Sequence, residues 1–307
     1  MSTNQNQPIK IAVVGDIHSQ WGEEDHLALA HLDVDLVLFV GDFGNEEVEI
    51  VRKVASLDMP KAIVLGNHDA WYTASKWGQH NCPYDPSQED RVQEQLDILG
   101  DLHVGFSKLD FPQLNLSVVG GRPFSWGGSR WKNRRFLRAR YDVGNFNASA
   151  YRILDNVKEA AYDTIVFLGH NGPLGLGKRP KDICGRDWEP LGGDYGDPDL
   201  AKAIKETREM GKSVPLVCFG HMHHRLRYTQ EKLRRMAFLD AEGTVHVNAA
   251  SVPRIIEEDD QRLRNFTIVS LENNQVSQVA LVWIGKEYSV VSEKVLYPKD
   301  KLHEIGK

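Results

Sequence analysis

The sequence predicts an α/β protein whose first strands are parallel and whose last strands are antiparallel. Between Ile9 and Gly66, short apolar runs that end in glycine alternate with segments of helical spacing. Helices that connect strands of one sheet form right-handed crossovers, and such crossovers make the strands parallel. The final third instead contains short strands separated by turns, a pattern typical of antiparallel hairpins.

In the first part of the chain, continuous apolar runs indicate strands that are covered on both faces. We expect strands at 9–15, 36–41 and 61–66, with helices at 23–32 and 46–57 between them. The glycine at the end of each run allows the chain to turn sharply there.

The middle of the chain is less regular. We expect helices at 89–99, 147–160 and 197–211, a strand at 116–121, and strands that lead to His170 and to His221. The loop from Gly172 to Gly196 is long. Loops of more than ~15 residues inside a compact domain are usually functional or mobile.

The end of the chain reads as strands at 236–240, 244–248, 265–271 and 276–284, which are expected to close a second sheet as antiparallel hairpins. No linker-like stretch divides the sequence, so one domain is expected at 9–290. A flexible N-terminal tail at 1–8 and a C-terminal tail at 291–307 would flank it.

Composition favours an ordinary soluble globule in the cytoplasm. The 307 residues are 41% hydrophobic and 26% charged, and the net charge of -6 argues against a general nucleic-acid binder. The N-terminus lacks the apolar core of a signal peptide, and no apolar run approaches the ~18 residues of a membrane span. Cys82, Cys184 and Cys218 are far apart, which suits a reducing compartment and small packing residues.

Five of the expected strands end in residues that can bind metal. In open α/β sheets, ligands bind beyond the carboxyl ends of the strands. Carboxylate, amide and imidazole donors together suit Mn, Fe or Zn better than Ca or Mg alone, although Mg remains an alternative. Seven donors suit two ions about 3.5 to 4 Å apart, bridged by one carboxylate, an arrangement used in phosphoryl chemistry. The candidate ligands are Asp16, His18, Asp42, Asn67, His170, His221 and His223.

These residues lie in five ordered blocks: GDIH at 15–18, GD at 41–42, GNHD at 66–69, GH at 169–170 and GHMH at 220–223. In this pattern the chain, over roughly residues 10 to 254, resembles the calcineurin-like metallophosphoesterase superfamily. The resemblance implies a four-layer α/β/β/α sandwich of two mixed β-sheets flanked by helices.

The resemblance also implies roles for individual residues. Asp16, His18 and His223 would hold one ion, and Asn67, His170 and His221 would hold the other, with Asp42 as the bridge. His68 would stand beside the leaving group. The stretch GDFGN at 41–45 lacks the continuation of the Ser/Thr protein phosphatase branch, so that activity is disfavoured. In VNAASVPR at 247–254, two alanines replace residues of a turn that is mainly structural in the superfamily.

The expected activity is hydrolysis of a small phosphorylated molecule, a monoester or a diester, by in-line attack of a hydroxide that bridges the two metals. His68, held by Asp69 in the required tautomer, would protonate the departing alkoxide. Asn67 and His68 would also contact the substrate. Arg122 either points at a substrate phosphate or is a solvated arginine.

Two other functions stay open. A non-catalytic scaffold that binds a protein partner would be expected to have lost ligands, and none is lost here. A nuclease could use six cations that are interleaved with aromatic residues, but the same cations could form a solvated helix face, or one or two of the arginines could reach a small anionic substrate. Nucleic acid is therefore an unlikely partner. The six cations are Arg130, Lys132, Arg134, Arg135, Arg138 and Arg140.

Trp71, Tyr72 and Trp77 follow the GNHD block directly. They would either wall a pocket or pack in a core or lid.

Overall fold

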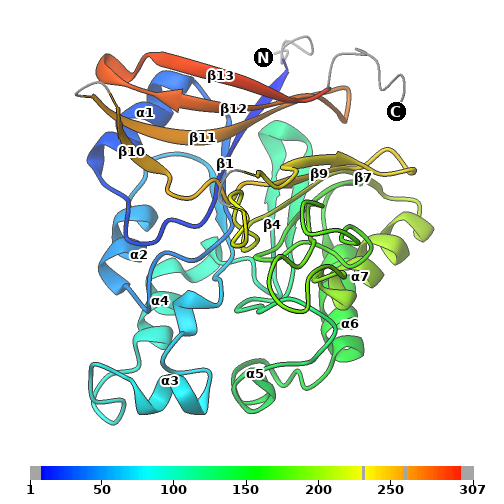
Figure 1. Ribbon diagram of the computed structural model, residues 1–307. Coiled ribbons are helices and arrows are strands. Elements are labelled where there is room, and N and C mark those ends of the chain that lie inside the picture. The colour runs from blue at the N-terminus through cyan, green and yellow to red at the C-terminus, as the bar shows by residue number, and fades with distance from the viewer. Residues whose placement is uncertain (1–7, 230–231, 259–260, 299–307) are drawn as a thin grey trace.

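Two β-sheets lie face to face, with helices on both outer faces (Figure 1). The computed structural model describes residues 8–229, 232–258 and 261–298. The expected four-layer α/β/β/α sandwich is confirmed.

The first sheet has the strand order β13-β12-β11-β1-β2-β3, with β10 paired to β11. Its strands β1, β2 and β3 run parallel, as expected from the helices between them. The remaining strands pair antiparallel with their neighbours, beginning where Ile11 of β1 lies opposite Val269 of β11. The strands are β1 (Ile9–Val14), β2 (Leu36–Phe39), β3 (Lys61–Ile63), β10 (Ile255–Glu258), β11 (Gln261–Glu272), β12 (Gln275–Ile284) and β13 (Val290–Tyr297).

The second sheet has the order β4-β5-β6-β7-β9-β8. Its four central strands, from β5 to β9 in that order, are parallel, and an antiparallel strand lies at each edge. The strands are β4 (Lys108–Phe111), β5 (Leu116–Gly120), β6 (Thr164–Leu168), β7 (Ser213–Phe219), β8 (Ala237–Leu239) and β9 (Val245–Asn248).

The helices cover the two sheets from outside. Figure 1 shows α1, α2 and α4 on one side of the molecule and α6 and α7 on the other, with α3 and α5 at the end away from β13. Helix α6 begins where the Asn145 side chain accepts a hydrogen bond from the Ala148 amide, a typical N-cap. The helices are α1 (Glu23–Leu32), α2 (Val48–Ala55), α3 (Lys76–His80), α4 (Arg91–Leu99), α5 (Arg134–Tyr141), α6 (Phe146–Glu159) and α7 (Pro198–Glu209).

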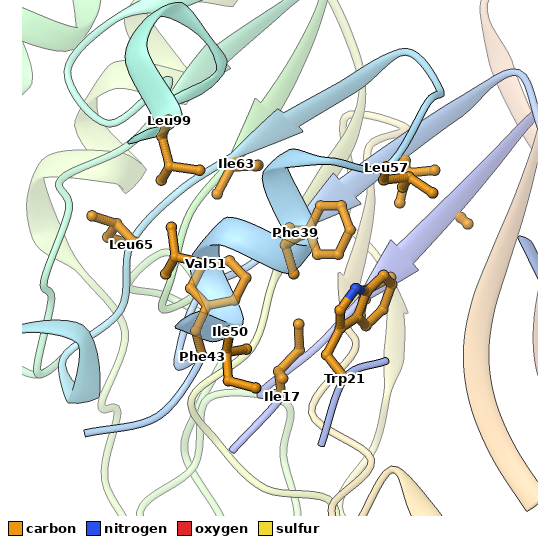
Figure 2. Packing of buried hydrophobic residues seen from close by; sticks show 14 of the residues in the cluster. Ile17, Trp21, Phe39, Phe43, Ile50, Val51, Leu57, Ile63, Leu65 and Leu99 are labelled. Atoms are coloured by element: carbon orange, nitrogen blue, oxygen red, sulfur yellow. The ribbon is translucent and has the colours of Figure 1, made fainter. Parts of the chain in front are cut away.

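Three apolar clusters correspond to the three interfaces of this sandwich. One lies between the first sheet and its helices, where Phe39 and Phe43 pack against Val51 of α2 (Figure 2). A second fills the space between the sheets, and a third lies under α6 and α7. Each fully buried side chain of this kind contributes roughly 1.5–3 kcal/mol to folding. The strand ends that carry the candidate ligands are therefore held on a rigid frame.

The expected closure of a second sheet by the C-terminal hairpins is wrong for most of that segment. Strands β11, β12 and β13 extend the first sheet, because β11 pairs antiparallel with β1. Strand β9 does join the second sheet, but it pairs parallel with β7. Hairpin patterns predict that neighbouring strands pair with each other, but they do not determine which sheet edge the hairpin joins.

The expected domain boundary at residue 290 is also wrong, because β13 spans Val290–Tyr297 and belongs to the first sheet. Of the expected tails, residues 1–7 and 299–307 lie outside the described part of the chain. Within the described ranges, no helix has the length and apolar character needed to cross a membrane.

Candidate metal centre

The seven candidate ligands converge where the carboxyl ends of strands from both sheets meet. The first sheet brings Asp16 and His18 after β1, Asp42 after β2 and Asn67 after β3. The second sheet brings His170 after β6, and His221 and His223 after β7. The strands of each set are parallel, so their carboxyl ends lie at one edge, which is where ligands bind in α/β sheets.

Asp16, His18 and His223 form the first ligand group, with potential donor atoms within 4.8 Å of one another. His223 Nε2 lies 3.2 Å from Asp16 Oδ2 and 3.3 Å from His18 Nε2. Two imidazole nitrogens this close need either a proton or a cation between them, since two facing lone pairs repel. Asp16 Oδ2 itself is buried and accepts no hydrogen bond.

Asp42, His170 and His221 form the second group, and Asn67 lies beside it. His170 Nδ1 donates to the Val40 carbonyl at 2.7 Å, so its Nε2 carries the lone pair. That nitrogen faces Asn67 Oδ1 at 2.9 Å and Asp42 Oδ1 at 3.4 Å. A cation bound between these buried atoms would be coordinated by all of them. The donor set of both groups therefore fits two divalent ions.

The backbone is strained at the ligands. Asp16, His18, Asp42 and His221 have φ values of 32°, 43°, 56° and 66°, a region that residues other than glycine seldom adopt. Such conformations cluster at functional sites, where the surrounding fold enforces them.

Two glycines make room for the carboxylates. A Cβ at Gly66 would lie 2.3 Å from Asp42 Oδ1, and a Cβ at Gly220 would lie 2.2 Å from Asp16 Oδ1. Any side chain at either position would displace a candidate ligand.

A sharp turn brings His221 and His223 to different ligand groups. The Met222 amide donates to the Gly220 carbonyl at 2.7 Å, and the His221 amide donates to Asp16 Oδ1 at 3.1 Å. From the turn at 247–254, Asn248 Nδ2 donates to the Met222 carbonyl at 2.7 Å. The turn with two alanines thus supports the ligand-bearing turn directly.

Burial and neighbouring charges shift the pKa values of the side chains at the site. Burial alone would raise the pKa of Asp16, but the His223 imidazole, 3.2 Å from Oδ2, and the other nearby imidazoles hold that pKa below its ordinary value. Burial, reinforced by neighbouring imidazoles, lowers the pKa of His221 and lowers the pKa of His68 to about 3. His221 and His68 are therefore neutral at pH 7. A histidine that binds a metal must be neutral, so this state of His221 suits a ligand.

His68 lies beside the second group, but its partner differs from the expected one. Its Nδ1 donates to Asn45 Oδ1 at 2.6 Å, which leaves the Nε2 lone pair 4.0 Å from Asp42 Oδ2. The Asp69 carboxylate instead accepts backbone hydrogen bonds from Gly66, Asp42 and Phe43 at 2.7 to 2.9 Å. The expected contact between Asp69 and His68 is wrong, because the turn after Gly66 directs Asp69 inward toward the backbone.

Arg122 does not reach the site. Its guanidinium forms ion pairs with Asp197 and Asp199 at 2.8 Å each and lies over the Trp131 ring at 4.8 Å. With 5% of its surface exposed, Arg122 ties the end of β5 to the start of α7. Both expectations, a phosphate contact and a solvated side chain, are wrong. The sequence places both aspartates at the capped start of a helix, now α7. That local role gave no indication that they pair with Arg122.

A cavity of about 310 Å³ opens in front of the ligands. His68 and Trp71 line it, so Trp71 belongs to a pocket wall, which was one of its two interpretations. Trp77 does not line it and is 62% exposed. Other wall residues were not expected at the site: Trp126, Lys132, Asp187, Trp188, Tyr195, Met222, Arg225, Arg227 and Arg234. Of these, Trp126 and Lys132 lie in the stretch of interleaved cations and aromatics, and Asp187, Trp188 and Tyr195 lie in the long loop from Gly172 to Gly196, which the sequence also marks.

Asn45 and Arg234 are further contributors that the sequence did not reveal. Arg234 donates from Nε to the His223 carbonyl and from Nη1 to the carbonyls of Pro180 and Asp182, each at 3.0 Å. It thus joins the loop from Gly172 to Gly196 to the turn that carries His223. No local motif marks either residue, although Asn45 follows Asp42 closely.

Solved structures of other proteins resemble this chain. One is 12% identical over 88% of this chain and 98% of its own, with a TM-score of 0.52, which is a likeness of fold. TT1561 of Thermus thermophilus is 12% identical over 88% of this chain and 97% of its own, with a TM-score of 0.48. A dimetal phosphatase from Danio rerio is 11% identical over 94% of this chain and 99% of its own, with a TM-score of 0.47.

No curated protein matches the sequence. A family model described as calcineurin-like phosphoesterase matches residues 9–225, which include all seven candidate ligands. The chain therefore belongs to the calcineurin-like phosphoesterase family.

Proposed function

We propose that the protein is a dinuclear metal-dependent hydrolase of small phosphoesters. The observation that carries the proposal is the convergence of potential metal-ligating atoms: His170 Nε2 faces Asn67 Oδ1 and Asp42 Oδ1, next to the group of Asp16, His18 and His223. Asp42 belongs to the second group, and its backbone carbonyl accepts a hydrogen bond of 2.8 Å from the amide of His18 in the first group, so its carboxylate would bridge the ions. The complete ligand set argues against a non-catalytic scaffold.

Two divalent ions held here would lower the pKa of bound water from ~15.7 towards ~7 and would stabilise negative charge on the phosphoryl oxygens. Mn, Fe or Zn suits the mixed donors best, with Mg as an alternative. The cavity of about 310 Å³ lies at the lower end of the range for small-molecule sites, which favours a small substrate over a polymer.

His68 is positioned to assist the leaving group. Asn45 fixes its Nδ1–H, so Nε2 is the atom that can carry a proton to a departing alkoxide. Before substrate binds, burial keeps the ring neutral, with a pKa of about 3. A phosphoester anion beside the ring raises that pKa, because a nearby negative charge favours the imidazolium. His68 Nε2 takes up a proton from solvent when the substrate binds. Water attacks phosphorus in line and releases a proton to solvent, the bond from phosphorus to the ester oxygen breaks, and the alcohol leaves with the proton from His68.

The cytoplasm is the compartment that we propose for this reaction, supported by the scattered cysteines of the sequence.

The test is to strip the protein of metal and reload it separately with Mn, Fe, Zn and Mg. Hydrolysis of nitrophenyl phosphate and of bis(nitrophenyl) phosphate is then measured against the stripped protein, which also decides between monoester and diester. We expect activity that appears with metal and disappears again on chelation. Absence of hydrolysis of both esters with all four metals, at two bound ions per chain, would contradict the proposal.

A further inference from the structure

Two segments that the metal centre does not explain meet at the cavity. One is the start of the basic segment, 126–132, and the other is the loop from Gly172 to Gly196. The Gly128 amide donates to the Tyr195 carbonyl at 2.8 Å. Gly127 and Gly128 have φ values of 64° and 82°, and a Cβ at either would lie 2.9 Å or less from an atom of another residue. These glycines allow the backbone at 127–128 to lie against Tyr195, and Lys132 contacts the same residue.

Aromatic rings lead from the metal centre outward along one wall. The Trp71 ring stacks on His68, with centroids 4.3 Å apart and planes 12° apart. Trp126 stacks next, 5.2 Å from Trp71 and 25° from its plane. Trp188 and Tyr195 meet edge to face at 4.6 Å and line the same cavity. Since the stack begins at His68, the aromatic surface lies on the leaving-group side of the site.

Cations lie along the same cavity without acidic partners. Lys132 Nζ donates to Tyr195 Oη at 2.8 Å and lies 5.5 Å from the Trp126 ring centroid. Arg225 and Arg227 are exposed and also line the cavity. Among the described residues, none of these three cations forms an ion pair, whereas Arg234 in the same wall is paired with Asp187 at 3.2 Å. Outside the ligand groups, the cavity wall therefore carries positive charges that no acidic side chain of the described residues neutralises.

We propose that the leaving group of the substrate contains an aromatic ring and a second phosphate, as in a nucleoside bisphosphate. This inference rests on the proposed phosphoesterase function, which places the scissile phosphate at the ligand groups. The ring would contact the aromatic wall, and the second phosphate would be held by Lys132, Arg225 and Arg227. Water cleaves only the ester bond at the metal centre, giving inorganic phosphate and an alcohol that keeps the second phosphate.

The test compares kcat/KM for four compounds, in which the aromatic ring and the second phosphate are each present or absent independently of the other. Adenosine 3′,5′-bisphosphate has both, adenosine 5′-monophosphate has the ring, fructose 1,6-bisphosphate has two phosphates, and ribose 5-phosphate has neither extra feature. We expect kcat/KM to rise roughly tenfold to hundredfold for the second phosphate, the value of hydrogen bonds between charged groups. The ring should add roughly threefold to tenfold, as aromatic contacts do.

Variants assign the effect to the cavity. Lys132→Met and Arg227→Gln should each remove most of the advantage of the bisphosphate over the monophosphate. Nitrophenyl phosphate has no second phosphate, so in both variants kcat/KM for the bisphosphate should fall by a larger factor than kcat/KM for nitrophenyl phosphate. Arg130→Gln is the matched control, because Arg130 is an exposed cation of the same segment that does not line the cavity.

Binding to the metal-free protein, measured by calorimetry, separates this inference from the proposed function. Preferential binding of adenosine 3′,5′-bisphosphate over the monophosphate, lost in Lys132→Met, supports the inference even if no compound is hydrolysed. Hydrolysis of all four compounds with equal kcat/KM, or equal binding of both adenosine nucleotides, would overturn it while leaving the phosphoesterase intact.

Discussion

His68 Nδ1 donates a hydrogen bond of 2.6 Å to Asn45 Oδ1. This bond fixes which ring nitrogen faces the reaction centre, and His68 contributes no ligand atom to either group. His68→Ala should therefore keep its metals, while turnover of alkyl phosphates falls by roughly 10² to 10⁴. Nitrophenyl esters should lose much less, because their oxygen departs without a proton. Equal loss on both substrate types would refute the general-acid role.

Asn45→Ala should cause a smaller defect of the same kind, roughly tenfold to hundredfold, because the ring loses its orientation but keeps its nitrogen atoms. Asn45→Asp is the matched variant, since its carboxylate still accepts from Nδ1 and should restore much of the rate. The measurement is kcat for alkyl and nitrophenyl esters at equal metal content. A purely structural role for Asn45 would lower both rates alike.

Asp42→Asn should lose metal together with activity. Asp42 belongs to the second ligand group and contacts His18 of the first through its backbone carbonyl, and an amide cannot bridge two cations as a carboxylate does. Elemental analysis of the dialysed protein measures the loss, with Asp58→Asn as an exposed control. Full metal content with normal turnover in Asp42→Asn would exclude the bridging role.

Asp69→Ala should destabilise the fold by about 3 kcal/mol or more, because three buried backbone amides lose their acceptor. Urea unfolding of the metal-free protein measures this loss, and the exposed Asp58→Ala serves as control. If Asp69→Ala has unchanged stability and is slower only on substrates with poor leaving groups, Asp69 instead acts in catalysis together with His68.

Acid should destabilise the protein partly through His103, far in sequence from the ligands. Burial lowers its pKa from 6.5 to about 4, and its Nε2 has no hydrogen-bond partner. The unfolded chain takes up this proton first, so the contribution is complete above pH 6.5 and is lost as the pH falls towards 4. Between pH 7 and pH 5 the expected loss is about 2 kcal/mol.

The measurement is urea unfolding at both pH values for the wild type and for His103→Gln. The variant should lose about 2 kcal/mol less than the wild type over this interval. His80→Gln, at an exposed position, should keep the dependence of the wild type. Identical pH dependence in the wild type and His103→Gln would rule out the contribution of His103.

Single-stranded DNA should bind weakly and with little dependence on salt. Arg140 is engaged with Asp90 at 2.7 Å, and Arg134 donates to the Gly144 carbonyl at 2.9 Å. A nuclease with several phosphate contacts would show a slope of about -0.7 per contact in log affinity against log salt. Tight binding at low salt that falls steeply and weakens in a variant lacking Arg134, Arg135 and Arg138 would support the nuclease instead.

By itself, the sequence determined the parallel beginning of the chain and the ligand positions. A strand that ends in glycine and a polar residue is a local pattern, and parallel strands bring their ends to one edge whatever the rest of the fold does. The strand pattern therefore predicts that Asp42 and Asn67 lie at the same edge of the first sheet, whereas the approach of His170, from the second sheet, to within 3.4 Å of Asp42 depends on how the two sheets pack.

Only the tertiary structure decided which partners the other side chains meet. Asp69 is adjacent to His68 in sequence, yet the turn directs it to backbone amides, and His68 pairs with Asn45. Arg122 finds Asp197 across 75 residues of chain. Strands β11 and β12 would pair with each other in either sheet, and the pairing of β11 with β1 places them in the first sheet. Side-chain direction and sheet edges depend on packing between distant segments, and local patterns do not contain that information.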